Sequence, residues 1–198
     1  VMTILDTDVL VADAQESTGL TDFGDDTLPG RVALVVDRLN SAVLDDTGSR
    51  AAAHTIGGLL TSRLHFVADQ ARLPLKAEQI TAPIFATGEP RSGTTLLHAL
   101  LAEDESSRAL RFWEVMYPSP PPGPATVDDL RRAQSDADWR EILDRIPPWI
   151  VSHPYNDLLG SGLPECERTW AFDFRATNPS AWWRVPVTIQ NFPQDPHT

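Results

Sequence analysis

The stretch that most constrains the fold is Pro83–His98, with the sequence PIFATGEPRSGTTLLH. Ala82–Thr87 is a short apolar run without helical period, which is typical of a buried parallel strand. Gly88–Thr95 then supplies two glycines, an arginine, a serine and two threonines, and Thr94–Leu101 has leucines at helical spacing. A strand, a glycine turn and a helix N-terminus in this order can wrap backbone N–H groups around a phosphate-like anion.

The segments on either side of this loop predict an α/β fold with a helical part before it. Ala109–Trp113 is a candidate second strand, so the order strand, turn, helix, strand forms a βαβ unit. Upstream, residues 28–44 and 51–71 carry apolar side chains every three or four positions, which predicts two long helices. We therefore expect a helical cap over residues 1–75 and a partial P-loop α/β domain over residues 76–198.

Other segments have local patterns that predict loops or helices. Residues 1–27 have a mixed pattern, and residues 18–26 are typical of a loop. Pro118–Pro124 has five prolines in seven residues and predicts an extended loop. Helices are expected over residues 126–145 and 164–172.

Composition excludes several classes of protein. The formal net charge of −12 argues against nucleic acid as a partner, although a few local arginines can still hold one anionic ligand. The sequence has no run of about 18 apolar residues, so it predicts no membrane span. The acidic start lacks the features of a secretory signal, and the single Cys166 allows neither an intramolecular disulfide nor a cysteine-based zinc site. We expect a cytoplasmic protein.

The loop has the glycine spacing of a P-loop but not its lysine. Gly88 and Gly93 are separated by four residues, and Gly93 is followed by Thr94 and Thr95, where a nucleotide triphosphatase has Lys and then Ser or Thr. The missing lysine argues against hydrolysis of ATP or GTP. Arg91 lies within the loop instead, where a guanidinium can stabilise a leaving phosphate oxygen.

The segment Pro90–Thr95 (PRSGTT) resembles the 5′-phosphosulfate-binding loop of the sulfotransferases, whose usual form is Pro-Arg/Lys-Ser-Gly-Thr-Thr. Three further segments are similar to the bacterial, largely actinobacterial, branch of that family: Thr18–Gly24 (TGLTDFG), Arg111–Pro122 (RFWEVMYPSPPP) and Leu163–Glu167 (LPECE). The resemblance extends from about residue 15 to residue 187. It implies a P-loop-containing three-layer fold with a parallel sheet, of which this chain resembles the N-terminal half.

The resemblance also implies the chemistry. The donor would be 3′-phosphoadenosine 5′-phosphosulfate (PAPS), whose sulfuryl group passes in line to an acceptor hydroxyl or amine on a small molecule, glycan or lipid, without a metal. Arg91 would neutralise the leaving oxygen. The residues expected to bind the donor are Gly88, Pro90, Arg91, Ser92, Gly93, Thr94 and Thr95. The oligomeric state stays open.

Two residues are candidates for the base that activates the acceptor. The resemblance favours a glutamate downstream of the loop, and Glu114 stands 23 residues after Arg91 at the end of the predicted second strand. Strand ends line the active crevice in such sheets, and desolvation beside Trp113 suits a general base. The alternative is that Glu114 has a structural role and pairs with Arg108 or Arg111. His153 is the rival base, because residues 150–154 faintly resemble the catalytic histidine segment of the cytosolic branch.

One expected segment has no match. The family binds the donor's 3′-phosphate with an Arg-Asp-Pro segment followed by a serine, and nothing after Val187 resembles it. The predicted α/β fold is therefore incomplete at its C-terminus. Two other functions stay open: a truncated, non-catalytic P-loop relative that binds nucleotide weakly, and a P-loop small-molecule kinase. The missing segment favours the first of these over the kinase.

Overall fold

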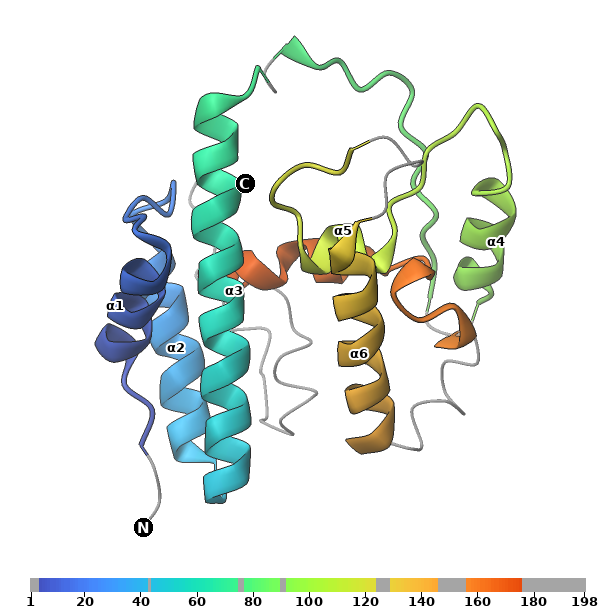
Figure 1. Cartoon of the computed structure of the whole chain (residues 1–198). Coiled ribbons are helices and arrows are strands. Elements are labelled where there is room, and N and C mark those ends of the chain that lie inside the picture. The colour runs from blue at the N-terminus through green and yellow to red at the C-terminus, as the bar shows by residue number, and fades with distance from the viewer. Residues whose placement is uncertain are drawn as a thin grey trace. The chain divides into compact units, whose positions relative to one another are not determined.

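The computed structural model describes residues 4–42, 44–74, 77–89, 92–123, 129–145 and 156–175 (Figure 1). In chain order its elements are helices α1 (Thr7–Thr18), α2 (Leu28–Ser41), α3 (Asp46–Arg72), α4 (Thr94–Leu101), α5 (Phe112–Met116) and α6 (Leu130–Arg145), then the 3₁₀ helices η2 (Asn156–Ser161) and η3 (Cys166–Asp173). Within these ranges no residue is in a β-strand. None of the described helices is long and apolar enough to cross a membrane.

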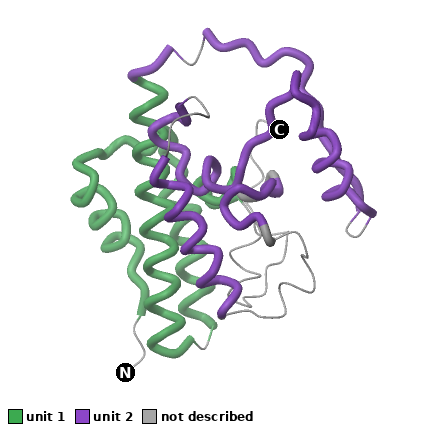
Figure 2. Tube along the Cα trace, turned by 45° about the vertical axis from the view of Figure 1, so that its right-hand side comes forward, with its two compact units in different colours: residues 1–71, 166–198 green, residues 72–165 purple. Residues whose placement is uncertain are grey.

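The chain divides into two compact units (Figure 2). The first combines residues 1–71 with residues 166–198, and the second comprises residues 72–165. The first unit therefore contains α1, α2, nearly all of α3 and η3, whereas the second contains the candidate anion-binding loop with α4, α5, α6 and η2.

Helix α1 is defined by the residues that cap its ends. The Asp6 carboxylate accepts hydrogen bonds from two backbone N–H groups of the first turn, at 2.9 and 3.1 Å. Gly19 has a left-handed backbone (φ 67°) and donates its N–H to the Gln15 carbonyl oxygen at 2.8 Å. Aspartate and glycine are preferred at these two positions for this reason. Helix α1 was not predicted, because the pattern of residues 1–27 is mixed.

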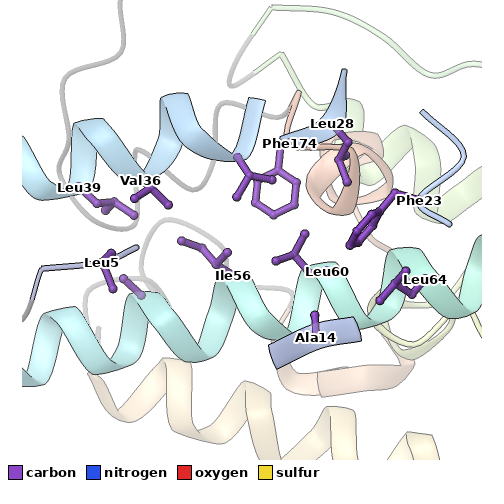
Figure 3. Close-up of a cluster of buried hydrophobic side chains, with 12 residues drawn as sticks. Leu5, Ala14, Phe23, Leu28, Val36, Leu39, Ile56, Leu60, Leu64 and Phe174 are labelled. Atoms are coloured by element: carbon purple, nitrogen blue, oxygen red, sulfur yellow. The ribbon is translucent and has the colours of Figure 1, made fainter. Parts of the chain in front are cut away.

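The core of the first unit lies between α2 and α3. Buried side chains of the two helices point toward one another (Figure 3): Leu28, Val36 and Leu39 on α2, and Ile56, Leu60 and Leu64 on α3. Val32 of α2 and Ala52 of α3 are buried in the same cluster. Phe174, which directly follows η3, lies in the same cluster. Each large apolar side chain buried in this way contributes about 1.5 to 3 kcal/mol to folding. The two predicted helices are confirmed, and α3 begins earlier than expected because Asp45 accepts the Gly48 N–H at 2.7 Å.

An ion-pair network around Asp173 joins the two sequence segments of the first unit. Oδ1 of Asp173 accepts hydrogen bonds from Arg31 Nη2 at 3.1 Å and Arg63 Nη1 at 3.0 Å, and Oδ2 pairs with Arg175 Nε at 2.9 Å. Arg31 also donates to the Asp173 carbonyl oxygen at 2.8 Å and to Asp25 Oδ2 at 2.9 Å. The Arg31 side chain is 6% exposed, so its charge depends on these two carboxylates for compensation.

In the second unit, α5, α6 and η2 pack around two aromatic rings. Phe112 meets Trp139 edge to face, with ring centroids 4.5 Å apart. Gly160 in η2 approaches α6 so closely that a Cβ there would lie 2.7 Å from Oγ of the fully buried Ser135. The Phe112 N–H also donates to the carbonyl oxygen of Gly162 at 2.9 Å. These contacts hold the start of α5 against the other two elements.

The predicted strands are not found in the described residues. Phe112 and Trp113 lie in α5, so the second strand predicted over Ala109–Trp113 is wrong at its C-terminal end. Ala82–Thr87 has no assigned secondary structure, and its Ile84 and Phe85 side chains are largely exposed. A strand is defined by hydrogen bonds to a neighbouring strand, and the described segments provide none. The parallel sheet stays a prediction. The helix predicted over residues 164–172 is a 3₁₀ helix, η3.

We expect Asp173→Asn to lower the free energy of unfolding by roughly 2 to 3 kcal/mol, because it leaves the buried Arg31 guanidinium with less compensating charge. Urea unfolding followed by circular dichroism measures the change. Asp37→Asn, at an exposed position on α2, is the control and is expected to have little effect. Equal stability of the two variants would contradict the role given to the network.

Stability is also expected to depend on Asp25 under acid conditions. The Thr27 hydroxyl donates to Asp25 Oδ1 at 2.7 Å, and this bond, with help from the Thr27 N–H and Arg31, holds the pKa of Asp25 well below its ordinary value of 3.8. A depressed pKa in the folded state stabilises the protein above pH 3.8, and this contribution is lost as the pH falls below it. The difference in unfolding free energy between the unchanged chain and Asp25→Asn should therefore shrink below that pH. Asp26→Asn, at an exposed neighbouring position, is the control.

Candidate functional site

The candidate loop closes through a backbone hydrogen bond. The Ser92 N–H donates to the Glu89 carbonyl oxygen at 3.1 Å. Pro90 and Arg91, between these two residues, lie outside the described residues. The hydrogen bond holds Glu89 and Ser92 close together.

The two glycines of the loop are needed for different reasons. A Cβ on Gly88 would lie 2.7 Å from Oγ of Ser92 and 3.1 Å from Cγ2 of Thr94, so the backbone at Gly88 approaches too closely for a side chain. Gly93 has φ +89°, in the left-handed region that other residues enter only at a cost. A Cβ at Gly88 would have to displace the Ser92 side chain, whereas one at Gly93 would meet open space but put the backbone under strain.

Helix α4 presents its N-terminus to this turn. Gly93 is its N-cap residue, and no side chain in the described residues caps the helix there. The first N–H groups of a helix lack acceptors within the helix and carry a partial positive charge. Ser92 and Thr95 are exposed and Thr94 is partly buried, so their hydroxyl groups and backbone lie beside these N–H groups. The donor set fits a phosphate or sulfate group.

The bounds of α4 confirm the helix predicted over Thr94–Leu101. Its apolar side chains are largely exposed: Leu96, Leu97 and Leu100 are 55%, 47% and 63% exposed. Burying an apolar helix stripe requires a second layer that packs against it. His98, on the same helix, is partly buried.

A tight turn after α4 leads to Arg108. The Asp104 carboxylate accepts hydrogen bonds from the Ser106 N–H at 3.0 Å, the Ser106 hydroxyl at 2.9 Å and the Ser107 hydroxyl at 3.3 Å. The bonds from Ser106, first through its N–H, lower the pKa of Asp104. The Ser107 N–H also bonds to the Asp104 carbonyl oxygen at 2.9 Å. This turn sets the direction in which the chain approaches α5.

Glu114 lies in the first turn of α5 and has both carboxylate oxygens engaged. Oε1 accepts a hydrogen bond from Arg108 Nη2 at 2.7 Å. Oε2 accepts one from the Arg111 backbone N–H, also at 2.7 Å, as part of a capping box in which Arg111 is the N-cap. The Glu114 side chain is 9% exposed, whereas that of Arg108 is 63% exposed. The site is a buried, oriented carboxylate with an exposed arginine on one oxygen.

The structure tests two predictions for Glu114: its place in the fold and its pairing with an arginine. Its expected place at a strand end is wrong, because it is the third residue of a helix. The predicted pairing with Arg108 is confirmed, and the contact with Arg111 runs through the backbone N–H. A role as base stays a prediction. The rival base, His153, lies outside the described residues.

Two arginines of α6, in the second unit, were not predicted. Arg131 and Arg132 each place the guanidinium carbon 5.1 Å from the centroid of the Trp113 ring. Arg131 also donates to the carbonyl oxygens of Tyr117, at 2.8 Å, and Pro120, which holds the beginning of the proline loop against α6. The sequence signal for Arg131 was the acid two positions before it, Asp129. Asp129 accepts a hydrogen bond from Arg131 Nε at 2.8 Å, and this bond lowers the pKa of Asp129 to about 2.

Tyr117, at the start of the same loop, is fixed by a carboxylate. Its hydroxyl donates to Asp138 Oδ2, while Gln134 Nε2 donates to the other oxygen of Asp138 at 2.9 Å. Burial raises the pKa of Tyr117 above its ordinary range, and the bond to Asp138 adds to this effect. The phenol therefore remains protonated at neutral pH. Among the residues described, no group of three or more His, Cys, Asp or Glu side chains could hold a metal ion.

Comparison with known proteins places the chain in a family. The model of the sulfotransferase family matches residues 83–191, which is more than half of the chain and includes the loop, α4 and Glu114. The chain belongs to the sulfotransferase family. Comparison with curated protein sequences finds no match.

Two solved structures are similar over almost all of this chain. Sulfotransferase STF1 from Mycobacterium tuberculosis H37Rv is 27% identical with a TM-score of 0.68, and the match covers 92% of this chain and 53% of that one. Sulfotransferase STF9 from Mycobacterium avium is 26% identical with a TM-score of 0.73, covering 91% of this chain and 46% of that one. The chain thus spans about half the length of each, consistent with the predicted N-terminal half.

Proposed function

We propose that this chain carries the donor-binding part of a sulfotransferase that uses PAPS and transfers a sulfuryl group to an acceptor hydroxyl or amine. The observation that supports this most is the close approach of Gly88 to Ser92 and Thr94 beside the N-terminus of α4. This cradle lies within the segment that the family model matches. A small molecule, glycan or lipid would be the acceptor, and the reaction would need no metal.

In this proposal the loop holds the 5′-phosphate of the donor. Backbone N–H groups of Gly93, Thr94 and Thr95 and the Ser92 hydroxyl would donate hydrogen bonds to its oxygens, and Pro90 would stiffen the turn. Arg91 would neutralise the charge that develops on the leaving phosphate oxygen. When bound, the donor supplies the activated sulfuryl group.

Glu114 is the proposed base. Its carboxylate is buried and held in one orientation, so it can take a proton from an acceptor hydroxyl without first reorienting. His153 is the alternative base. We also propose that Ala82–Thr87 is the first strand of a parallel sheet in the complete fold, that residues 1–75 form a cap on the domain of residues 76–198, and that the protein is cytoplasmic.

Calorimetry with 3′-phosphoadenosine 5′-phosphate, the donor product, against ATP with Mg²⁺ tests the proposal. We expect binding of the former and much weaker binding of the latter, because Thr94 stands where a P-loop has its lysine. Preference for ATP would overturn the proposal in favour of a small-molecule kinase. Binding of neither would favour a non-catalytic relative, which is the second candidate because the chain spans about half the length of its structural relatives.

Arg91→Ala is expected to reduce sulfuryl transfer by roughly 10² to 10³, because one charged donor to the leaving oxygen is lost. The rate of transfer from PAPS to a phenolic test acceptor is the measurement. Arg140→Ala, which removes an exposed arginine from α6, is the control with an unchanged rate. Unchanged turnover in Arg91→Ala would refute the role of Arg91.

Gly88→Ala is expected to weaken binding of the donor product by about tenfold, since the new methyl group would displace the Ser92 hydroxyl and disturb a charge-assisted hydrogen bond. Gly123→Ala is the matched control in the same unit, because a Cβ there meets open space. Calorimetry gives both affinities. Equal weakening by the two variants would show that the loop is not the binding site.

A further inference from the structure

We infer that Arg108 is a positioning residue for the Glu114 carboxylate, and that Oε1 rather than Oε2 is the oxygen that takes the proton of the acceptor. This inference rests on the proposed function and extends it to a residue and an atom. It is drawn from the unequal way in which the two oxygens are held.

Oε2 is committed to the helix. It accepts the Arg111 backbone N–H at 2.7 Å inside the capping box, and Arg111 is the N-cap of α5. The next residue, Phe112, is buried and bonds through its N–H to Gly162 at 2.9 Å. Freeing Oε2 would therefore leave the Arg111 N–H at the start of α5 without its cap, which makes Oε2 the poorer proton acceptor for a bound substrate.

Oε1 is held by a side chain that can move. In the described part of the chain, its hydrogen bond comes from Nη2 of Arg108, at 2.7 Å. Arg108 is 63% exposed, and ion pairs with such an exposed partner exchange readily with solvent. Glu114 itself is 9% exposed, so the direction of Arg108 is the one from which a ligand can reach the carboxylate.

Arg108 is also the cation that faces this carboxylate from the chain segment before α5. The other nearby guanidinium, that of Arg111, directs Nη1 to the Ser161 carbonyl oxygen at 3.4 Å. The backbone leading to Arg108 is fixed by the Asp104 turn, in which the Ser107 N–H bonds to the Asp104 carbonyl oxygen at 2.9 Å. Arg108 can thus hold Oε1 in one direction until the acceptor arrives.

In the proton transfer, the acceptor O–H bond breaks and its proton goes to Oε1 of Glu114. The acceptor oxygen forms a bond to sulfur, while the bond from sulfur to the donor phosphate breaks and its electron pair leaves with that phosphate. Glu114 becomes neutral, so its attraction to Arg108 falls and the guanidinium is released from the carboxylate.

Arg108→Gln, Arg108→Lys and Glu114→Gln, made in the full chain, test the inference by steady-state kinetics with PAPS and a phenolic acceptor. We expect Arg108→Gln to lower kcat by about tenfold through misorientation of the base, with KM for the donor unchanged. Arg108→Lys should restore most of kcat because it keeps a cation on Oε1. In the Glu114→Gln background, Arg108→Gln should cause no further loss, since the two residues act as a unit. Arg140→Gln, an exposed arginine of α6, is the control.

The outcomes separate this inference from the proposed function. If the unchanged chain transfers the sulfuryl group and Arg108→Gln has the same kcat, this inference is overturned but the proposed function is not. A lower melting temperature without a change in kcat would assign Arg108 a structural role and would also overturn it. Additive losses in the double variant would show that Arg108 does not act through Glu114. Absence of transfer by the unchanged chain would overturn the proposed function and this inference with it.

Discussion

The hydrogen bond from the Arg111 N–H to Glu114 Oε2 is the interaction on which the described core of the second unit depends. It starts α5 at a defined residue, and the next two side chains, Phe112 and Trp113, then enter the core of that unit. Phe112 packs against Trp139 of α6, and the Trp113 ring receives two guanidinium groups from the same helix. A helix of five residues has little intrinsic stability, so its cap and these contacts must hold it.

The first unit depends on charge in a comparable way. Asp173 is separated from Arg31 by 142 positions and from Arg63 by 110, yet its carboxylate pairs with both. The family model begins at residue 83, but the two structural relatives match at least 91% of the chain, which requires the preceding helices as well. The Asp173 network therefore joins the N-terminal helices, which those relatives share, to a segment inside the family match.

Local signals predicted the helices, whereas contacts between distant residues were beyond prediction. The bounds of α4 followed from Gly93 and from the leucines after it, and the stripes of α2 and α3 followed from apolar spacing. Helix α1 was missed because its signal lies in the capping residues at its two ends and not in its weak apolar pattern. Ala109–Trp113 is too short for its period to separate strand from helix, and the capping box decided for helix. The Glu114–Arg108 pair was open in advance because both Arg108 and Arg111 lie within reach of that carboxylate.

The same carboxylate thus serves the fold and the proposed chemistry, and this limits how the site can change. A residue without a side-chain acceptor at position 114 would leave the Arg111 N–H uncapped, which typically costs about 1 kcal/mol, in addition to removing the base. Glutamine keeps an acceptor oxygen for the helix but cannot take a proton at neutral pH. Aspartate is shorter by one methylene, so it cannot span the distance to the N-cap and also hold its second oxygen toward Arg108. Structure and proton transfer together therefore favour glutamate at this position over its closest chemical relatives.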